Sequence, residues 1–149
     1  MTNPLTLLMP VAPGVDPAAI GAALAKYHDQ IQAALTSVGT VHYARFLLLD
    51  RSSPSLQPGA GKGPFVLGVI TEYDGDFNAY IQDFVAKVGT VFDALLSFTV
   101  GGKEITPVAN HISAFIAYVR KYDASQQKGA AGLYQAYPQT VQQILAAFE

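Results

Sequence analysis

The sequence predicts a single α+β domain, spanning residues 1–149, in which a four-stranded antiparallel sheet carries its helices on one face. Three observations support this fold class. Half of the 149 residues are hydrophobic, which suffices for one sizeable core. Short apolar runs alternate with stretches in which apolar residues recur every three or four positions. Glycine, proline and aspartate mark the boundaries, so the expected order of elements is β-α-β-β-α-(α)-β-α.

The first strand and the first helix are expected within the first 39 residues. The run LTLLM at 5–9 has the composition of a strand and stops at Pro10. Asp16 followed by Pro17 is typical of a helix N-cap and first helical position, and Gly39 suits the end of that helix. Its apolar stripe consists of Ile20, Leu24, Tyr27, Ile31 and Leu35.

Two further strands are expected in the middle of the chain. The stretch VHYARFLLLD at 41–50 indicates a buried strand, and PFVLGVITEY at 64–73 indicates the next one. The segment between them, 51–63, has the serine, proline and glycine content of a loop. Strands adjacent in sequence pair in most sheets, so we expect these two to be antiparallel neighbours.

A second helix is expected to begin after Asp76, and Gly89 interrupts its apolar pattern. The tetrapeptide VGTV at 88–91 also occurs at 38–41, where it leads into a strand. Residues 95–100 are therefore an alternative strand. Strict alternation of polar and apolar residues is missing there, which favours a helical continuation.

The C-terminal third predicts a helix, a loop, a strand and a final helix. Thr106-Pro107 is expected to start the helix, and 124–132 has loop composition. The run LYQAY at 133–137 predicts the fourth strand, and Thr140 is expected to cap a terminal helix.

This order of elements corresponds to a ferredoxin-like fold, in which helices cover only one side of the sheet. The chain resembles the dimeric α/β-barrel superfamily in that order over nearly its whole length. The resemblance implies a homodimer with the bare sheet faces together, and a ligand site over the open face. The superfamily includes cofactor-free monooxygenases, isomerases, haem enzymes and non-enzymatic proteins.

One short motif is similar to a branch of that superfamily, the dye-decolourising peroxidases. Thr71-Glu72-Tyr73-Asp74-Gly75 is similar to their Gly-x-x-Asp-Gly motif, with Thr71 in place of the first glycine. The chain is about half their length, and His111 is poorly placed to be a haem ligand. For these two reasons we expect no cofactor. A haem-linked, peroxidase-like relative is kept only as a second alternative.

Composition argues against several classes of partner. The net charge is −2 and no basic cluster occurs, which disfavours nucleic acid. The chain has no cysteine, and no apolar run reaches the ~18 residues that span a membrane. The N-terminus lacks the basic region of a signal peptide, so a cytoplasmic location is expected. With only 13% charged residues, some apolar surface is expected to be covered in a homodimer.

His42 and Arg45, inside the strand at 41–50, are the candidate catalytic residues. Strict alternation places His42 on one face with Ala44, and Arg45 on the other, unless a bulge intervenes. Glu72 or Asp74 on the next strand could reach either residue. His42 would accept a proton, while Arg45 would hold a carboxylate or enolate. The alternative is a structural ion pair between Arg45 and Glu72 or Asp76.

The expected ligand is a small apolar or aromatic molecule that carries oxygen. If the protein is an enzyme, the expected reaction is cofactor-independent proton transfer or oxygenation of that molecule. The alternative is a non-catalytic binding or assembly protein. His28, His42 and His111 lack metal-ligand spacing, so we expect no metal site. Candidate ligand-binding residues, all on or beside the predicted sheet, are Tyr43, Glu72, Tyr73 and Tyr134.

Overall fold

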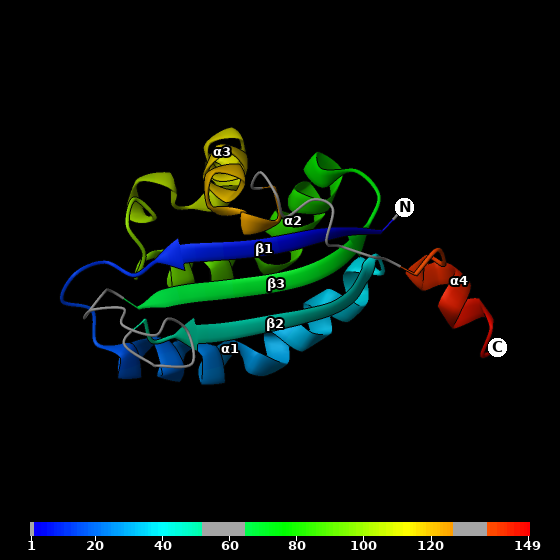
Figure 1. The fold of residues 1–149 in the computed structure, drawn as a ribbon, viewed down its shortest axis with the longest axis horizontal. Helices are drawn as coiled ribbons and strands as arrows, with labels where there is room; N and C mark the ends of the chain where they lie inside the picture. The colour runs from blue at the N-terminus through cyan, green and yellow to red at the C-terminus, as the bar shows by residue number, and fades with distance from the viewer. Residues whose placement is uncertain (1, 52–64, 127–136) are drawn as a thin grey trace.

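Three strands form an antiparallel sheet in the order β1-β3-β2 in the computed structural model, which describes residues 2–51, 65–126 and 137–149 (Figure 1). They are β1 (Thr2–Pro10), β2 (Val41–Leu49) and β3 (Val66–Asp74). Because both outer strands pair antiparallel with β3, β1 and β2 run in the same direction. The α+β class and the pairing of β2 with β3 are confirmed. The predicted fourth strand lies outside the described residues except for Tyr137, which is not in a strand.

Helix α1 (Pro17–Val38) connects β1 to β2 and has the ends that the sequence predicts. The Asp16 carboxylate accepts a hydrogen bond from Ala18 N at 2.9 Å, which satisfies one of the free donors of the first turn. Gly39 ends the helix in the left-handed conformation, with φ at 70°.

Helix α2 (Phe77–Leu96) follows β3 and is capped by Asp76, whose carboxylate accepts hydrogen bonds from the amides of Asn78 and Ala79. It bends at Val88, where φ is −129° and ψ is 17°, directly before Gly89. The helical continuation after Gly89 is confirmed. A strand over 95–100 is wrong, because α2 runs to Leu96 and Thr99 makes only one isolated bridge.

Helix α3 (Ile112–Tyr122) starts later than the sequence predicts. Two short 3₁₀ turns, Lys103–Ile105 and Val108–Asn110, precede it. The Val108 side chain is fully buried, and its amide donates to Asp93 Oδ1 on α2 at 2.7 Å. This tertiary contact fixes the segment on α2, so the regular helix begins only after it.

The described helices α1, α2 and α3 cover one side of the sheet, and Figure 1 shows the strands in front of α1 and α2. Phe92 lies at the centre of this layer, with its ring centroid 5.1 Å from that of Phe84 and 5.5 Å from that of Phe115. Phe46 on β2 approaches Phe92 edge to face. Alternate strand residues complete this core, namely Leu5, Leu7, Met9, Leu67, Val69 and Tyr73.

Helix α4 (Val141–Ala146) lies beyond one end of the sheet, at the same end as the N-terminus (Figure 1). All residues from 142 to 149 are exposed. Within the described part of the chain, no helix combines the length and apolarity needed to cross a membrane.

Candidate functional site

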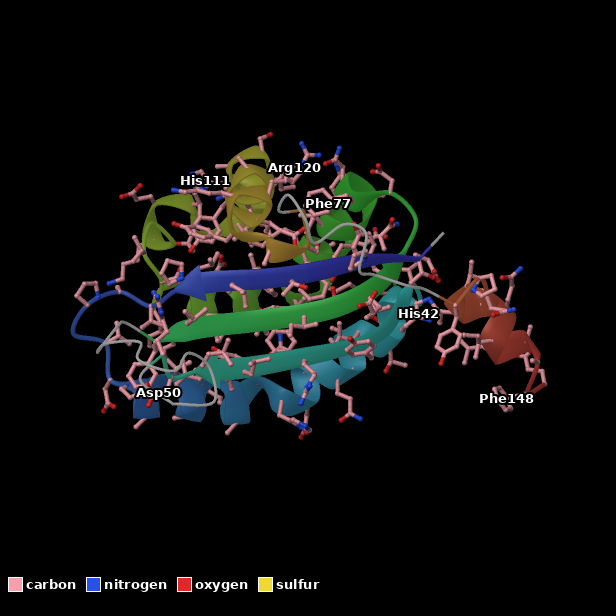
Figure 2. The ribbon with its side chains drawn as sticks, in the orientation of Figure 1. His42, Asp50, Phe77, His111, Arg120 and Phe148 are labelled. Atoms are coloured by element: carbon pink, nitrogen blue, oxygen red, sulfur yellow. The ribbon has the colours of Figure 1, made fainter. Side chains whose placement is uncertain are left out.

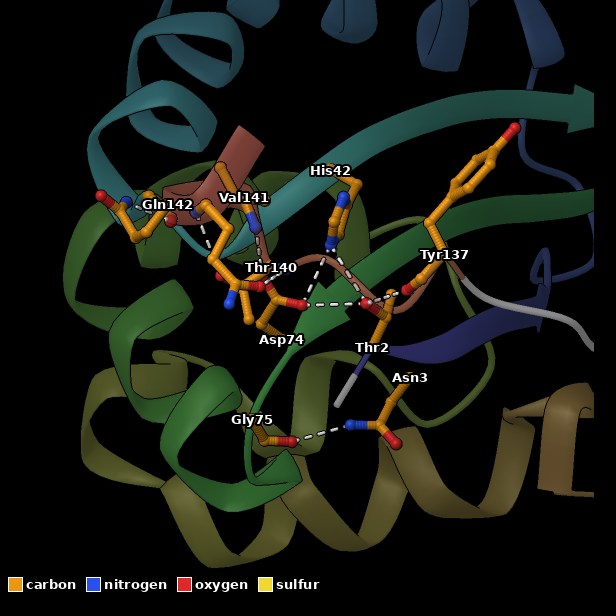
Figure 3. A network of polar contacts seen from close by, with 11 residues as sticks. Thr2, Asn3, His42, Asp74, Gly75, Tyr137, Thr140, Val141 and Gln142 are labelled. Atoms are coloured by element: carbon orange, nitrogen blue, oxygen red, sulfur yellow. Dashed lines mark hydrogen bonds and ion pairs between the residues drawn. The ribbon is translucent and has the colours of Figure 1, made fainter. Parts of the chain in front are cut away.

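The beginnings of β1 and β2 meet the end of β3 at one end of the sheet. Thr2 pairs in register with Asp74, the last residue of β3, and His42 lies near the start of β2. The antiparallel pairing explains this, because the first residues of both outer strands flank the last residue of the central strand. Three polar side chains from distant parts of the sequence therefore converge (Figure 3).

A β-bulge turns His42 towards this cluster. Val41 lies opposite Tyr73 and Tyr43 lies opposite Glu72, so His42 is an additional residue in β2. An additional residue shifts the alternation of side chains and increases the local twist of the strand. His42 thereby reaches the side chains at the end of β3.

Strict alternation would place His42 and Arg45 on opposite faces, but a bulge is the exception to that expectation, and here it brings both residues to the same face. Ala44 pairs with Thr71 on the side that the helices cover, whereas His42 contacts Asp74 on the other side. Arg45, one position after Ala44, also belongs to the side that none of the described helices covers, hereafter the uncovered side. His42 therefore shares a side with Arg45 and not with Ala44, because strict alternation fails at the inserted residue.

The Asp74 carboxylate is the centre of the cluster. Its Oδ1 lies 3.0 Å from His42 Nε2 and accepts from Thr2 Oγ1 at 3.0 Å. Its Oδ2 accepts from the amide of Val141, the first residue of α4, at 2.8 Å. Thr2 Oγ1 is also 3.2 Å from His42 Nε2. One carboxylate therefore connects all three strands with α4.

The carboxylate determines which ring nitrogen of His42 carries a proton. Nε2 faces an acceptor oxygen, so Nε2 is the protonated nitrogen and donates to Asp74. Among the described residues, no hydrogen bond engages Nδ1. The side chains of His42 and Asp74 are 15% and 10% exposed. An acid that orients a half-buried imidazole in this way prepares the other nitrogen to accept a proton.

The same contacts set the charge of Asp74. Burial alone raises the pKa of this carboxyl group, but the hydrogen bonds from Val141 N, His42 and Thr2 and the nearby imidazole outweigh it. The net result is a pKa below the usual 3.8. Asp74 is therefore ionised at neutral pH.

Helix α4 reaches this cluster through its first turn. Thr140 and Gln143 form a reciprocal capping box, as the sequence predicts for Thr140 as the cap. The amide of Val141 is not used by that box and donates to Asp74 instead. The Gln142 side chain donates to Gly39 O at 2.8 Å, which links α4 to the end of α1.

A hollow of about 300 Å³ lies between α4, the end of α1 and the start of β2. Among the described residues that line it, His42 is the only titratable one and most of the others are apolar. The volume is at the lower limit of small-molecule pockets. The apolar lining comes from Leu35, Val41, Val141, Ile144 and Leu145.

Arg45, Glu72 and Tyr43 lie on the uncovered side of the sheet, outside this cluster. Arg45 and Tyr43 are exposed, the latter by 48%. Arg45 forms no ion pair with Glu72 or Asp76 in the described structure, so that predicted alternative is wrong. Within the same residues, Glu72 Oε2 is buried without a hydrogen-bond partner. Asp76 instead caps α2.

Tyr73 and Tyr134, also predicted to bind a ligand, are not part of the cluster described above. Tyr73 lies on the helix-covered side, and its ring stacks on Tyr80 at 4.1 Å between centroids. Burial, followed by the charges of Asp123 and Asp76, raises the pKa of Tyr73 to about 12. Tyr134 lies outside the described residues.

The other histidines take no part in the Asp74 cluster. His111 Nδ1 donates to Pro107 O at 3.0 Å, and Figure 2 shows this residue away from His42. His28 pairs with the exposed Asp29 beside it. No group of three or more histidine, aspartate or glutamate residues within 2–51, 65–126 and 137–149 is arranged to hold a metal.

A larger hollow, of about 550 Å³, lies between α1 and the outer edge of β2. Its walls include Leu24, Ile31 and Phe46, and His28 lies at its rim. The His28 side chain is 72% exposed and its neighbour Asp29 is fully exposed. No buried acid orients that imidazole, so the smaller hollow beside His42 is the better chemical site.

Sequence reasoning identified His42 and named Asp74 as one possible neighbour, but it missed Thr2 and α4. The capping sequence from Thr140 to Gln143 showed that a helix begins there. Nothing in that sequence indicated that its first amide binds a residue 67 positions earlier.

Comparison with known proteins finds no matching family model, no matching curated protein and no matching solved structure. The chemistry of the site therefore follows from its own residues.

Proposed function

We propose that the protein binds a small apolar or aromatic molecule that carries oxygen, and that His42 accepts a proton from this molecule. The bound molecule occupies the hollow between α4, α1 and β2. The observation that carries the proposal is the partly buried Asp74–His42 pair, whose imidazole lies in the wall of an apolar hollow. A phenol, an enol or a carbonyl compound with an acidic C–H group is the matching substrate class.

In this proposal, the apolar residues of the hollow bind the ligand, and His42 and Asp74 carry out the proton transfer. Leu35, Ile144 and Leu145 contact the apolar part of the ligand and displace water from it. His42 Nδ1 takes the proton, and Asp74 stabilises the imidazolium that forms. Because the two side chains are shielded from solvent, this stabilisation is stronger than it would be in water. The reaction needs no cofactor for the proton transfer itself.

The test uses 4-nitrophenol, a small aromatic alcohol whose absorption band shifts when it loses its proton. We expect saturable binding and an excess of the phenolate form over the free compound at the same pH. His42→Gln removes the basic nitrogen and is expected to abolish this excess. His28→Gln is the matched control, because His28 lies on the rim of the other hollow. An unchanged phenolate band in His42→Gln would exclude His42 as the acceptor.

A second candidate function is assembly through the uncovered face of the sheet. Leu8, Leu47 and Ile70 lie on that side by register, and Arg45 and Glu72 are its charged strand residues away from the Asp74 cluster. An apolar face of this kind is normally covered. We therefore propose a homodimer with the sheet faces together, as the resemblance to dimeric α/β barrels implies.

A ferredoxin-like arrangement of each copy is part of this second proposal. The order β1-β3-β2 is the order of three of its four strands. Asp123, after α3, forms an antiparallel bridge with Leu7 at the outer edge of β1, where the fourth strand of such a sheet pairs. Asp123 Oδ1 also accepts from the amide of Thr6 at 3.0 Å.

Sedimentation equilibrium tests the assembly. The wild type is expected to be dimeric at micromolar concentration, and Leu47→Lys is expected to shift it towards the monomer. Val100→Lys is the matched control, because Val100 is an exposed hydrophobic residue away from the sheet face. A monomeric wild type would exclude this candidate and leave the His42 proposal intact.

A further inference from the structure

We propose that α4 is a movable wall of the His42 hollow, held by the same carboxylate that orients His42, so that ligand binding and α4 docking are coupled. This inference rests on the proposed function, because it assumes that the hollow receives a ligand. It adds a regulatory element, namely a helix whose position controls access to the proton acceptor.

The first argument is that α4 is held by few contacts. Its described hydrogen bonds to the strands and to α1 are Val141 N to Asp74 Oδ2 and Gln142 Nε2 to Gly39 O. A helix of six residues is not stable by itself in water, so its position depends on these bonds. An element with few buried contacts opens at low cost relative to the core.

The second argument is that α4 has unused apolar surface beside the hollow. Ile144 and Leu145 line the hollow, yet they are 37% and 53% exposed. A ligand between α4 and Leu35 would cover part of this surface on one side and part of α1 on the other. Such a ligand favours the docked position, and by linkage the docked position favours the ligand.

The third argument is the double use of Asp74. Oδ1 binds His42 and Oδ2 binds Val141, so the group that orients the base also holds the wall (Figure 3). When α4 moves away, Asp74 loses one donor and gains access to water. Docking of α4 thereby keeps the carboxylate and the imidazole together in a dry environment, where their interaction is strongest.

Val141→Pro tests the coupling by removing the hydrogen bond to Asp74, and it keeps an apolar side chain at this position in the wall of the hollow. Proline has no amide proton, so the bond to Asp74 is lost, but proline is favoured at the first position of a helix. Thr140 has φ −74° and ψ 163°, the extended conformation that a residue before proline prefers. We expect 4-nitrophenol to bind about tenfold more weakly, as loss of one hydrogen bond to a charged group implies.

Two further variants complete the experiment. Gln142→Ala removes the hydrogen bond to Gly39 and is expected to weaken binding of 4-nitrophenol. Because alanine has a higher helix propensity than glutamine, this loss would not be due to a less stable α4. Phe148→Ser is the control, because Phe148 is 86% exposed and points away from the sheet (Figure 2). It is expected to bind 4-nitrophenol as the wild type does.

Amide hydrogen exchange provides a second readout. In the wild type, 4-nitrophenol is expected to slow exchange at Ile144 and Ala147, and Val141→Pro is expected to speed exchange at both. Equal affinity in the wild type, Val141→Pro and Gln142→Ala would overturn the coupling and leave the proposed function standing. If the wild type does not bind 4-nitrophenol, both proposals fail. If His42→Gln loses binding while Val141→Pro and Gln142→Ala keep it, the coupling fails and the proposed function stands.

Discussion

Replacing Asp74 by asparagine is the most direct test of the polar cluster, because it keeps the shape of the side chain and removes its charge. Asp74 accepts from His42 and Thr2 on one oxygen and from Val141 on the other. Asparagine has only one acceptor oxygen, so its NH₂ group must face at least one of these donors. Loss of a charge-assisted hydrogen bond costs about 1.5–3 kcal/mol, and a buried donor without a partner costs about 1–3 kcal/mol.

We therefore expect Asp74→Asn to lower the free energy of unfolding by about 2–4 kcal/mol at pH 7. For a chain of this size, the midpoint of thermal unfolding falls by about 5–15 °C. Urea unfolding followed by circular dichroism measures the free energy, and a thermal scan measures the midpoint.

The effect must depend on pH with a defined sign. The pKa of Asp74 is lower in the folded protein than in the unfolded chain, where it is about 3.9. The unfolded chain therefore binds the proton first as the pH falls. The stabilisation is complete above about pH 5, and it is lost as the pH drops through the lower pKa of the folded state. The difference between wild type and Asp74→Asn should shrink over that range.

Asp29→Asn is the matched control, because the Asp29 side chain is fully exposed beside His28. It is expected to change the free energy of unfolding by no more than about 0.5 kcal/mol. Equal stability of wild type and Asp74→Asn at pH 7, or a difference that stays constant down to pH 2, would refute the account of the Asp74 carboxylate.

Three other predictions concern the core. Gly102→Ala is expected to destabilise the protein by at least about 2 kcal/mol in urea unfolding, because its Cβ would overlap the carbonyl oxygen of Leu96, whereas Gly21→Ala, in open space on α1, should stabilise it by about 0.5–1 kcal/mol. The Tyr73 hydroxyl is expected to ionise near pH 12, which the difference between the ultraviolet titrations of the wild type and Tyr73→Phe measures. The stability that the neutral hydroxyl contributes below about pH 10 is lost as the pH rises towards 12. Phe92→Ala should cost about 3–5 kcal/mol, measured by urea unfolding, since the ring is buried among three other phenylalanines.

The elements with strong local signals are those that the sequence predicted well. Asp16 and Gly39 delimit α1, Asp76 caps α2, and Thr140 caps α4, because each cap depends on contacts within a few residues. The start of α3 was predicted too early. Thr106-Pro107 favours a helix start locally, but the amide of Val108 donates to Asp93 on α2, and the regular helix begins only after this contact. No local sequence pattern reveals a contact of this kind.

The site shows the same division. His42 was recognisable as a polar residue inside an apolar strand, but alternation alone could not decide which face of the sheet it occupies. The bulge at that position depends on how β2 pairs with β3, and pairing between strands is a property of the folded chain. Thr2 and Val141 could not be assigned to Asp74 for the same reason.

The sequence by itself determined the α+β class, the caps of α1, α2 and α4, and the apolar character of the strands, because periodicity and caps act over short distances. Only the tertiary structure decided which polar groups meet. Antiparallel pairing brought the starts of β1 and β2 to the end of β3, and there one carboxylate binds an imidazole and the first amide of α4. Contacts between residues 32 to 67 positions apart depend on strand register and packing, which no short stretch of sequence encodes.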